Sequence, residues 1–474
     1  MRQADVQIID GPQGRDSAVI EVYDPGNGDL VGTVPSANLD DVEQVLATAS
    51  EASAVARKLP AHLRTSVLRQ VAEKLLSRHE EFAEVIAREG IKTICEARKE
   101  VTRCIETLRI SAEEARRLGG ETIAFDQMPG SENRFGYFKR LPVGVVVAIT
   151  PYNDPLNLVA HKIGPAIAAG NAVILKPHSS TPLSASNLVE LFDATELPTG
   201  VLQLITGPGA IIGDQLVSDP RVRMVSFTGG PDVGHKILAQ AGLKKISMEL
   251  GSNCPTIVVG DADMDLALEA TVSGAFWAAG QNCLHVQRIF IQNDHFEEFS
   301  KRFVERTRRL KTGDKLDEAT DMGPMINDAA VLKVSEFVRD AVDKGARILT
   351  GGECEGRYYQ PTVLDKVSAD CRISKEEVFG PVVALYPFDE VEKAIELAND
   401  VDYGLQAGVF TRDLATAHRI ADALNCGGVM INDSSDYRID AMPFGGTRGS
   451  GVGKEGVVHA IHEMTEAKTY CFNL

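Results

Sequence analysis

The sequence predicts an α/β protein built from two doubly wound domains and a small β arm. Apolar strand-like runs and helical stretches alternate from residue 143 to residue 250, and a second series of this kind extends from residue 255 to about residue 452. Such alternation is typical of doubly wound sheets, which bind nucleotides at the carboxyl ends of their strands. The 474 residues are also too many for a single hydrophobic core.

Helices are expected at the start of the chain, because apolar residues recur every three to four positions between residues 39 and 118. The mostly β-branched run at 143–149 then predicts a buried parallel strand. Further strands are predicted at NAVILKP, VLQLITG, RVRMVSFTG and KKISMEL, with helices between them. The second domain is predicted from PTIVV, RIFIQ, VVALYPF and GVMIN, and no Pro-rich linker separates it from the first. We therefore expect the two domains to pack closely, with a cleft between them.

The arm is predicted from two stretches, GYFKRLP and the C-terminal MTEAKTYCFNL, which resemble exposed strands. Exposed strand edges need a partner, so an oligomer is expected. The predicted boundaries are 1–121 and 143–250 for a dinucleotide-binding domain, 251–456 for a catalytic domain, and 122–142 with 457–474 for the arm.

Composition excludes several classes of protein. Hydrophobic residues make up 44% and charged residues 24% of the chain, which is ordinary for a globular enzyme. The formal net charge is −18 and no long Lys or Arg run is present, so nucleic acid is not an expected partner. No long apolar segment and no signal-peptide layout are found, which predicts a cytoplasmic protein without membrane contact.

The eight cysteines form no CxxC pair and accompany no His cluster, so reduced thiols and no metal site are predicted. Cys283, in AAGQNCLHVQRIF, lies between an apolar helical run and a strand. It is either a small buried thiol or a nucleophile, and the second interpretation needs supporting residues.

Two other stretches supply such residues. Glu249 ends the predicted strand KKISMEL, where an apolar environment would raise its carboxyl pKa and favour general-base chemistry. Asn153 lies between two prolines in ITPYNDPLN, and its amide could stabilise a developing oxyanion. A solvated Glu at a strand end and an Asn chosen for turn geometry are the structural alternatives.

The sequence resembles the aldehyde dehydrogenase superfamily over nearly its whole length. The matching stretches are LPVGVVVAITPYNDP, GPAIAAGNAVILKP, FTGG, MELGS, GQNC, EEVFGPV and PFGGTRGSGVGKEG, in the family's order and spacing. The resemblance implies that Cys283 attacks the aldehyde, that Asn153 and the Cys283 N–H hold the oxyanion, and that Glu249 activates water. It also places Lys162 behind the base, although a salt-bridged helix lysine is an equal alternative.

The resemblance further implies NAD or NADP as cofactor and a homodimer or homotetramer joined through the arm. Lys176 and Glu377 match residues that hold the two riboses, and Gly229 and Gly230 match the turn against the pyrophosphate, although Ser is common in the family at position 230. The other matching cofactor positions are Thr150, Pro151, Ser179, Gly209, Phe227, Leu250 and Phe379. Ser179 replaces a Glu that many NAD-preferring relatives have, so NADP should be tolerated.

The expected substrate is a small-molecule aldehyde, short, polar and anionic, such as succinic semialdehyde. Polar residues replace large apolar ones beside Tyr152, and Arg103 and Arg438 could bind an anionic group bidentately. Surface or structural salt bridges are the alternative for both arginines. The remaining expected pocket residues are Asn157, Asn282, Leu284 and Phe444. Transfer of the acyl group to coenzyme A, and a non-catalytic role on the same fold, remain alternatives.

Overall fold

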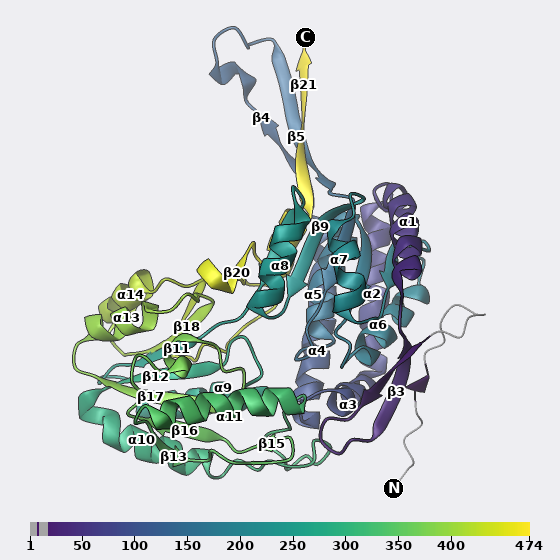
Figure 1. Cartoon of the computed structure of the whole chain (residues 1–474). Coiled ribbons are helices and arrows are strands. Elements are labelled where there is room, and N and C mark those ends of the chain that lie inside the picture. The colour runs from purple at the N-terminus through teal and green to yellow at the C-terminus, as the bar shows by residue number, and fades with distance from the viewer. Residues whose placement is uncertain (1–6, 9–17) are drawn as a thin grey trace.

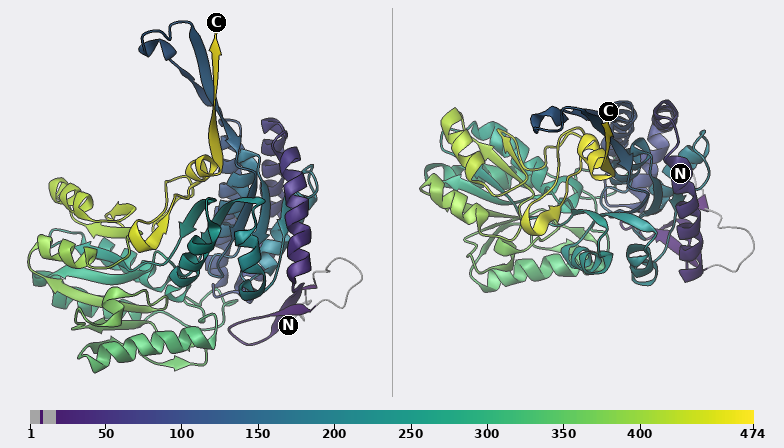
Figure 2. Two further views of the ribbon diagram at one scale, coloured as in Figure 1. Left: turned by 45° about the horizontal axis from the view of Figure 1, so that its top comes forward. Right: turned by 90° about the horizontal axis from the view of Figure 1, so that it is seen from above.

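The computed structural model describes residues 7–8 and 18–474, which form two α/β domains and a protruding β arm (Figure 1). The first domain, coloured purple to teal, and the second, coloured green, lie side by side in all views (Figure 2). The predicted fold class is therefore confirmed. Among the described residues, no helix is both long and apolar enough to span a membrane.

The sheet of the first domain has the strand order β20-β10-β9-β6-β7-β8. Its parallel strands are β6 (Val145–Ile149), β7 (Ala172–Lys176), β8 (Leu202–Leu204), β9 (Val222–Thr228) and β10 (Lys245–Glu249). Every residue of β7 is buried, as expected for a strand covered by helices on both faces. The order reverses beside β6, and such switch points are where doubly wound sheets bind ligands.

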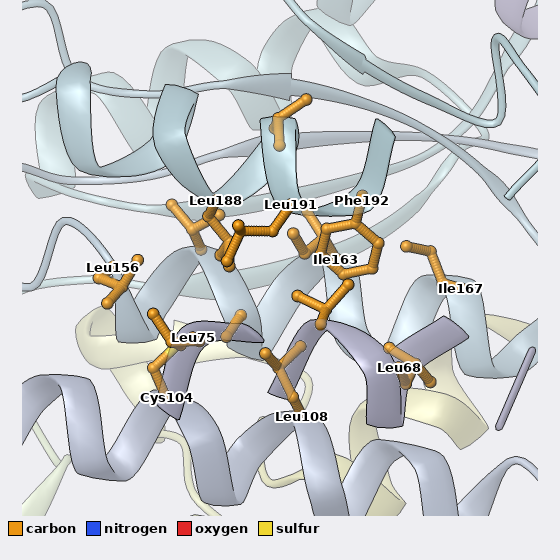
Figure 3. Packing of buried hydrophobic residues seen from close by; sticks show 14 of the residues in the cluster. Leu68, Leu75, Cys104, Leu108, Leu156, Ile163, Ile167, Leu188, Leu191 and Phe192 are labelled. Carbon is orange, nitrogen blue, oxygen red and sulfur yellow. The ribbon is translucent and has the colours of Figure 1, made fainter. Parts of the chain in front are cut away.

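The surrounding helices are α1 (Leu39–Ala56), α2 (Ala61–Ser77), α3 (His79–Glu89), α4 (Ile94–Glu114), α5 (Asn157–Ala169), α6 (Leu183–Asp193), α7 (Gly209–Ser218) and α8 (Pro231–Ala241). The predicted helical region 39–118 thus contains α1 to α4. Apolar faces of α2, α4, α5 and α6 meet in one core, where Leu68, Leu108, Ile163 and Phe192 converge (Figure 3). This core fixes α4 and α5, which carry residues of the site.

The sheet of the second domain has the strand order β13-β16-β17-β12-β11-β18-β19. Its strands are β11 (Cys254–Val258), β12 (Val286–Gln292), β13 (Arg347–Thr350), β16 (Thr362–Asp365), β17 (Val382–Phe388), β18 (Gln406–Phe410) and β19 (Gly428–Ile431). Its helices are α9 (Met264–Phe276), α10 (Asn293–Thr307), α11 (Asp328–Asp343), α12 (Arg372–Lys375), α13 (Val391–Asn399) and α14 (Leu414–Ala423). The sequence stretches that we expected to form strands do so, whereas β13, β16 and β18 were not anticipated.

Smaller elements complete the fold. A separate sheet contains β1 (Gln7–Ile8), β2 (Val19–Tyr23) and β3 (Leu30–Pro35), and β14 (Cys354–Glu355) pairs with β15 (Tyr358–Tyr359). The short helices are η1 (Phe125–Gln127), η2 (Trp277–Gly280) and η3 (Arg448–Ser450).

The arm consists of β4 (Gly120–Ile123), β5 (Arg134–Pro142) and β21 (Thr465–Asn473), with the C-terminus at its tip (Figure 1). Two boundaries differ from the expectation. Helix α15 (Val457–Glu463) buries its apolar residues in the core of the first domain rather than in the arm. Strand β20 (Gly451–Val452) pairs with β10, so the chain has already returned to the first sheet before residue 456.

Candidate active site

A cavity of about 720 Å³ opens at the carboxyl ends of the first sheet. All residues that we expected to contact the cofactor line it, namely Thr150, Pro151, Lys176, Ser179, Gly209, Phe227, Gly229, Gly230, Leu250, Glu377 and Phe379. Thr150 follows β6, Lys176 ends β7 and Gly229 follows β9, so successive parallel strands deliver these residues to one edge. The position agrees with the rule for ligands of doubly wound sheets.

The residues of this cavity fit a dinucleotide. Gly230 caps the N-terminus of α8, where backbone N–H groups and the helix dipole favour a pyrophosphate. A Cβ on Gly229 would lie 2.5 Å from the Phe227 ring, whereas a Cβ on Gly230 would meet nothing within 4 Å. The first glycine is therefore required by packing, and the second position has room for the Ser that we noted as common.

Two ionisable residues lie where the riboses are expected. The Lys176 ammonium is largely buried, which lowers its pKa to about 8, and its Nζ donates to the Pro177 carbonyl at 3.3 Å. Burial raises the pKa of Glu377 to about 7, and its Oε1 accepts the N–H of Ser252 at 2.7 Å. Both side chains retain hydrogen-bonding capacity for hydroxyl groups.

A second cavity, of about 350 Å³, lies on the other side of Cys283. Cys283 and Asn153 line both cavities, so the thiol and the amide lie where a nucleotide and a second ligand would meet. None of the hydrogen bonds among residues 18–474 involves the Asn153 side chain, which leaves its amide free to donate. This arrangement suits an oxyanion hole formed with the Cys283 N–H.

An unusual turn delivers Cys283. Ala278 and Ala279 have φ values of +50° and +53°, a left-handed conformation that costs non-glycine residues about 1–2 kcal/mol each, and Gly280 follows at +67°. The turn is held by Gln281, which donates to the Ala278 and Pro324 carbonyls at 3.3 and 3.1 Å. Strain that is held in place by surrounding contacts is typical of functional loops.

The electrostatics of Cys283 combine two opposing effects. Burial raises the pKa of its thiol, and the charge of Arg438 lowers it. The nearby Cys254 thiol contacts the Cys283 carbonyl at 3.6 Å and the Ser252 hydroxyl at 3.2 Å, and burial raises its pKa to about 11. Arg438 thus favours the Cys283 thiolate, the form that reacts with a carbonyl carbon.

Glu249, which also lines the nucleotide cavity, is almost fully buried, and neither carboxylate oxygen has a hydrogen-bond partner among the described residues. Burial and the charge of Glu455 raise its pKa well above the ordinary value, while Arg438 and Lys162 oppose that rise. A carboxyl with a raised pKa and free oxygens can accept a proton from water near neutral pH. Because Glu249 is buried, it is not the solvated Glu at a strand end that we considered as the structural alternative.

Lys162 lies behind Glu249 as one half of a buried ion pair. Its Nζ is 3.0 Å from Glu455 Oε1 and 3.2 Å from Ser226 Oγ. Burial alone would raise the pKa of Glu455, but Lys162 and Arg438 outweigh it and lower that pKa to about 2. Glu455 therefore stays ionised, and its negative charge acts on Glu249.

Arg103 and Arg438 both line the second cavity, together with Lys92 and Lys99. Each arginine already has a carboxylate partner. Arg103 Nη2 lies 2.7 Å from Asp440 Oδ1, and Arg438 Nη2 lies 3.2 Å from Glu455 Oε2. Both arginines thus form salt bridges, as in the alternative that we considered, and both also line the cavity.

The other residues that we expected to contact the substrate do not all line the second cavity. Asn282 and Leu284 line the second cavity, whereas Tyr152 lines the nucleotide cavity, edge-on to Phe379. Asn157 and Phe444 line neither. Asn157 is fully buried and bonded to Thr107 and Asp440, because it begins α5 and faces α4 rather than the ligand. Phe444 packs behind Cys283, with the Arg438 guanidinium 3.7 Å from its ring centre.

Several residues of the site were not anticipated from the sequence. They include Lys92, Lys99, His178, Lys333, Asp433, Asp436 and Glu455. Lys99 and Arg103 are four positions apart, a spacing that indicates one face of α4, whereas Lys92 precedes that helix. Glu455 lies in the stretch GKEG, which we had matched to the family without assigning it a role.

Comparisons with known proteins agree with this geometry. The model of the aldehyde dehydrogenase family matches residues 13–470. Aspartate-semialdehyde dehydrogenase 1 of Pseudomonas canavaninivorans is 48% identical over 455 residues, 96% of this chain and 97% of that protein.

Two solved structures extend the comparison. Aldehyde dehydrogenase 21 from Physcomitrella patens, in complex with the reaction product succinate, has a TM-score of 0.95 and 37% identity, covering 98% of this chain and 96% of that one. A glyceraldehyde-3-phosphate dehydrogenase from Methanocaldococcus jannaschii, complexed with NADP, has a TM-score of 0.92 and 37% identity, covering 96% of this chain and 99% of that one. The chain belongs to the aldehyde dehydrogenase family and is an NAD(P)-dependent enzyme.

Proposed function

We propose that the protein oxidises a short aldehyde carrying an anionic group, such as succinic semialdehyde, to the carboxylic acid. The observation that supports this most is the grouping of Arg103 and Arg438 with Lys92 and Lys99 around the cavity that also contains Cys283. The three similar proteins act on, or hold the product of, short aldehydes that carry a carboxylate or phosphate. Guanidinium groups bind such anions in a fixed geometry.

The chemistry follows from the side chains. The Cys283 thiolate adds to the aldehyde carbon, and the oxygen that becomes negative accepts hydrogen bonds from the Asn153 amide and the Cys283 N–H. NAD(P)⁺, bound in the nucleotide cavity, supplies the hydride acceptor. The resulting thioester on Cys283 is attacked by a water molecule that gives its proton to Glu249, and the acid leaves as the Cys283–carbon bond breaks.

Glu249 favours water over coenzyme A as the acyl acceptor. Its unpartnered carboxylate lines the same cavity as Cys283, where it could deprotonate a nucleophilic water. Steady-state turnover in the absence of coenzyme A is the expected result. A strict requirement for coenzyme A would contradict this assignment.

Cofactor preference is proposed from Ser179. Its hydroxyl donates to the Gly207 carbonyl at 3.2 Å and introduces no negative charge into the nucleotide cavity. A carboxylate at this place would repel a 2′-phosphate, so NADP should be accepted as well as NAD. Initial rates with each nucleotide at equal concentration give the preference directly.

We also propose a homodimer or homotetramer joined through the arm. Strand β21 lies at one edge of the arm sheet and most of its residues are exposed. Phe135, Tyr137, Tyr470 and Phe472 form an aromatic cluster on the arm. An exposed strand edge with aromatic residues favours pairing with another subunit. Sedimentation as a monomer at micromolar concentration would contradict this proposal.

The substrate proposal is tested with a matched pair of aldehydes. Butanal and succinic semialdehyde have the same number of carbons and differ in the carboxylate. We expect kcat/KM for succinic semialdehyde to exceed that for butanal at least about 100-fold, and Arg103→Gln to reduce this ratio about 10-fold or more. Equal rates with the two aldehydes, or an unchanged ratio in both Arg103→Gln and Arg438→Gln, would contradict the proposal. Lactaldehyde, glyceraldehyde phosphate, phosphonoacetaldehyde and benzaldehyde complete the panel, each with NAD and NADP.

A further inference from the structure

The two arginines of the second cavity are held in different ways. The Arg103 side chain is 34% exposed, and its Nη2 and Nε lie 2.7 and 3.4 Å from the carboxylate oxygens of Asp440. Its Nη1 is 3.8 Å from Asp154 Oδ2, which is too far for a hydrogen bond. Arg103 therefore keeps one edge of its guanidinium open for a ligand.

The Arg438 side chain, by contrast, is only 6% exposed. Its Nη2 lies 3.2 Å from Glu455 Oε2 and 3.4 Å from His161 Nε2. The guanidinium carbon is 3.7 Å from the centre of the Phe444 ring, and Phe444 in turn packs against Cys283. These contacts enclose the guanidinium beside the nucleophile and leave it little surface for a substrate.

Arg438 belongs to a buried group of side chains with an excess of positive charge. Glu455 pairs both with Arg438 and with Lys162, and the Lys162 and Glu455 side chains are 0% and 3% exposed. His161 adds no charge, because burial and the charge of Arg438 lower its pKa. Two cations thus share one anion away from solvent. Such an excess charge is stabilised by a further negative group in contact with it.

Cys283 and Glu249 are the groups that can supply this negative charge. Burial raises the pKa of both, and the charge of Arg438 opposes that rise in each. The other groups that act on Cys283 are Cys254, Glu377 and Glu249, and all three raise its pKa further. Arg438 is therefore the neighbour that favours the thiolate, and it favours the carboxylate of the base as well.

We propose that Arg438 acts as a buried cation on the nucleophile Cys283 and the base Glu249, whereas Arg103 binds the anionic group of the substrate. The second half of this inference rests on the proposed function, because it assigns the anion of the aldehyde to one of two candidate arginines. The first half does not depend on the substrate. Arg438 is a positioning residue in this account, since it acts through Cys283 and Glu249. A guanidinium suits this role because it stays charged throughout the pH range of an assay.

Alkylation of Cys283 by iodoacetamide, a neutral reagent, tests the first half without any substrate. The rate is followed against pH by mass spectrometry of the Cys283 peptide, because the chain has eight cysteines. Arg438→Met removes the charge, whereas Arg438→Lys keeps it. We expect the midpoint of the profile to rise by about one pH unit or more in Arg438→Met, with a rate near neutral pH at least about 10-fold lower. In Arg438→Lys the midpoint should return towards that of the parent.

Two other arginines serve as controls for the alkylation profile. Arg69→Gln removes an exposed charge from α2, and Arg103→Gln removes the other arginine of the cavity. Neither should move the midpoint by more than about 0.3 pH unit, because solvent screens the first charge and Asp440 pairs with the second. An unchanged midpoint in Arg438→Met, or an equal rise in Arg103→Gln, overturns the inference. If Arg438→Met does not fold, Arg438→Gln replaces it in the same comparison with Arg438→Lys.

Kinetics with butanal and succinic semialdehyde test the division between the two arginines. Arg438→Met should lower kcat/KM for both aldehydes by a similar factor, at least about 10-fold, and move the acidic limb of the kcat profile to higher pH, because Glu249 loses a favourable charge. Arg103→Gln should lower kcat/KM for succinic semialdehyde alone. A loss confined to succinic semialdehyde in Arg438→Met would make Arg438 a substrate contact and overturn the inference. Equal rates of the parent with the two aldehydes would contradict the proposed function and leave the alkylation result standing.

Discussion

Replacing Gly280 by alanine should disrupt the turn that places the nucleophile. Gly280 has a φ of +67°, and a Cβ there would lie 2.2 Å from the Gly380 carbonyl oxygen. The left-handed backbone costs alanine about 1–2 kcal/mol, which the reduced entropy of the unfolded chain offsets by about 0.4–1 kcal/mol. The steric overlap adds about 1–3 kcal/mol, because backbone must move to relieve it. We therefore expect a destabilisation of about 1–5 kcal/mol in total.

Gly345 is the matched control. It follows Lys344, the C-cap of α11, with a φ of +97°, and a Cβ there would meet nothing within 4 Å. Gly345→Ala should therefore cost only the backbone component, about 1 kcal/mol. Urea unfolding followed by circular dichroism gives both values, and kcat should fall about 100-fold in Gly280→Ala alone, since a displacement near 1 Å has that effect on catalysis. Equal destabilisation by the two substitutions, or full activity of Gly280→Ala, would refute the reasoning.

Further predictions concern the charges around the base and the cofactor. Glu455→Gln removes the negative charge that raises the pKa of Glu249, so the acidic limb of the kcat profile should move to lower pH, and an upward shift would be inconsistent with this role. Lys162→Met should move that limb to higher pH and destabilise the protein by about 3–5 kcal/mol, because it leaves Glu455 without its ion-pair partner. The double variant with Lys162→Met and Glu455→Gln should recover much of this stability, and additive losses of stability would argue against a coupled pair. The pKa of Glu455 in the folded protein is about 2, below its ordinary value of 4.5. Its contribution to stability is therefore present above pH 4.5 and is lost as the pH falls towards 2. Acid titration of the parent protein should show this loss, and acid titration of Glu455→Gln should not. Ser179→Glu should lower the ratio of kcat/KM for NADP to that for NAD about 5- to 10-fold, and an unchanged ratio would place the 2′-phosphate elsewhere.

Local pattern was sufficient to predict the fold where strands are fully buried. Strands such as β7 appear in the sequence as uninterrupted apolar runs because helices cover both faces. Helix α15 was assigned to the arm because nothing local distinguishes a short helix that packs on a distant core from one beside a strand. Its place depends on contacts with α4 and α5, which lie far earlier in the chain, at residues 94–114 and 157–169.

Some residues of the site could be predicted from the sequence and others could not. Cys283, Glu249 and Asn153 lie in recognisable stretches, and the structure places all three on one cavity. Asn157 was expected in the pocket because it is a polar residue where relatives that oxidise apolar aldehydes often have a large apolar one, but the α5 helix turns its side chain towards α4. Asp433 and Asp436 gave no such signal, because a loop sequence does not reveal which carboxylates remain unpaired after folding.

The covalent step on Cys283 is tested most directly by mass spectrometry of Glu249→Gln after mixing with NADP and succinic semialdehyde. Without the base, water attack should slow by about 10²- to 10⁴-fold, so the acyl group should remain attached. We predict about one equivalent of reduced nucleotide per subunit and an acyl adduct on the Cys283 peptide, with neither in Cys283→Ser. Formation of reduced nucleotide without an adduct, or an adduct on Cys254 instead, would contradict the account.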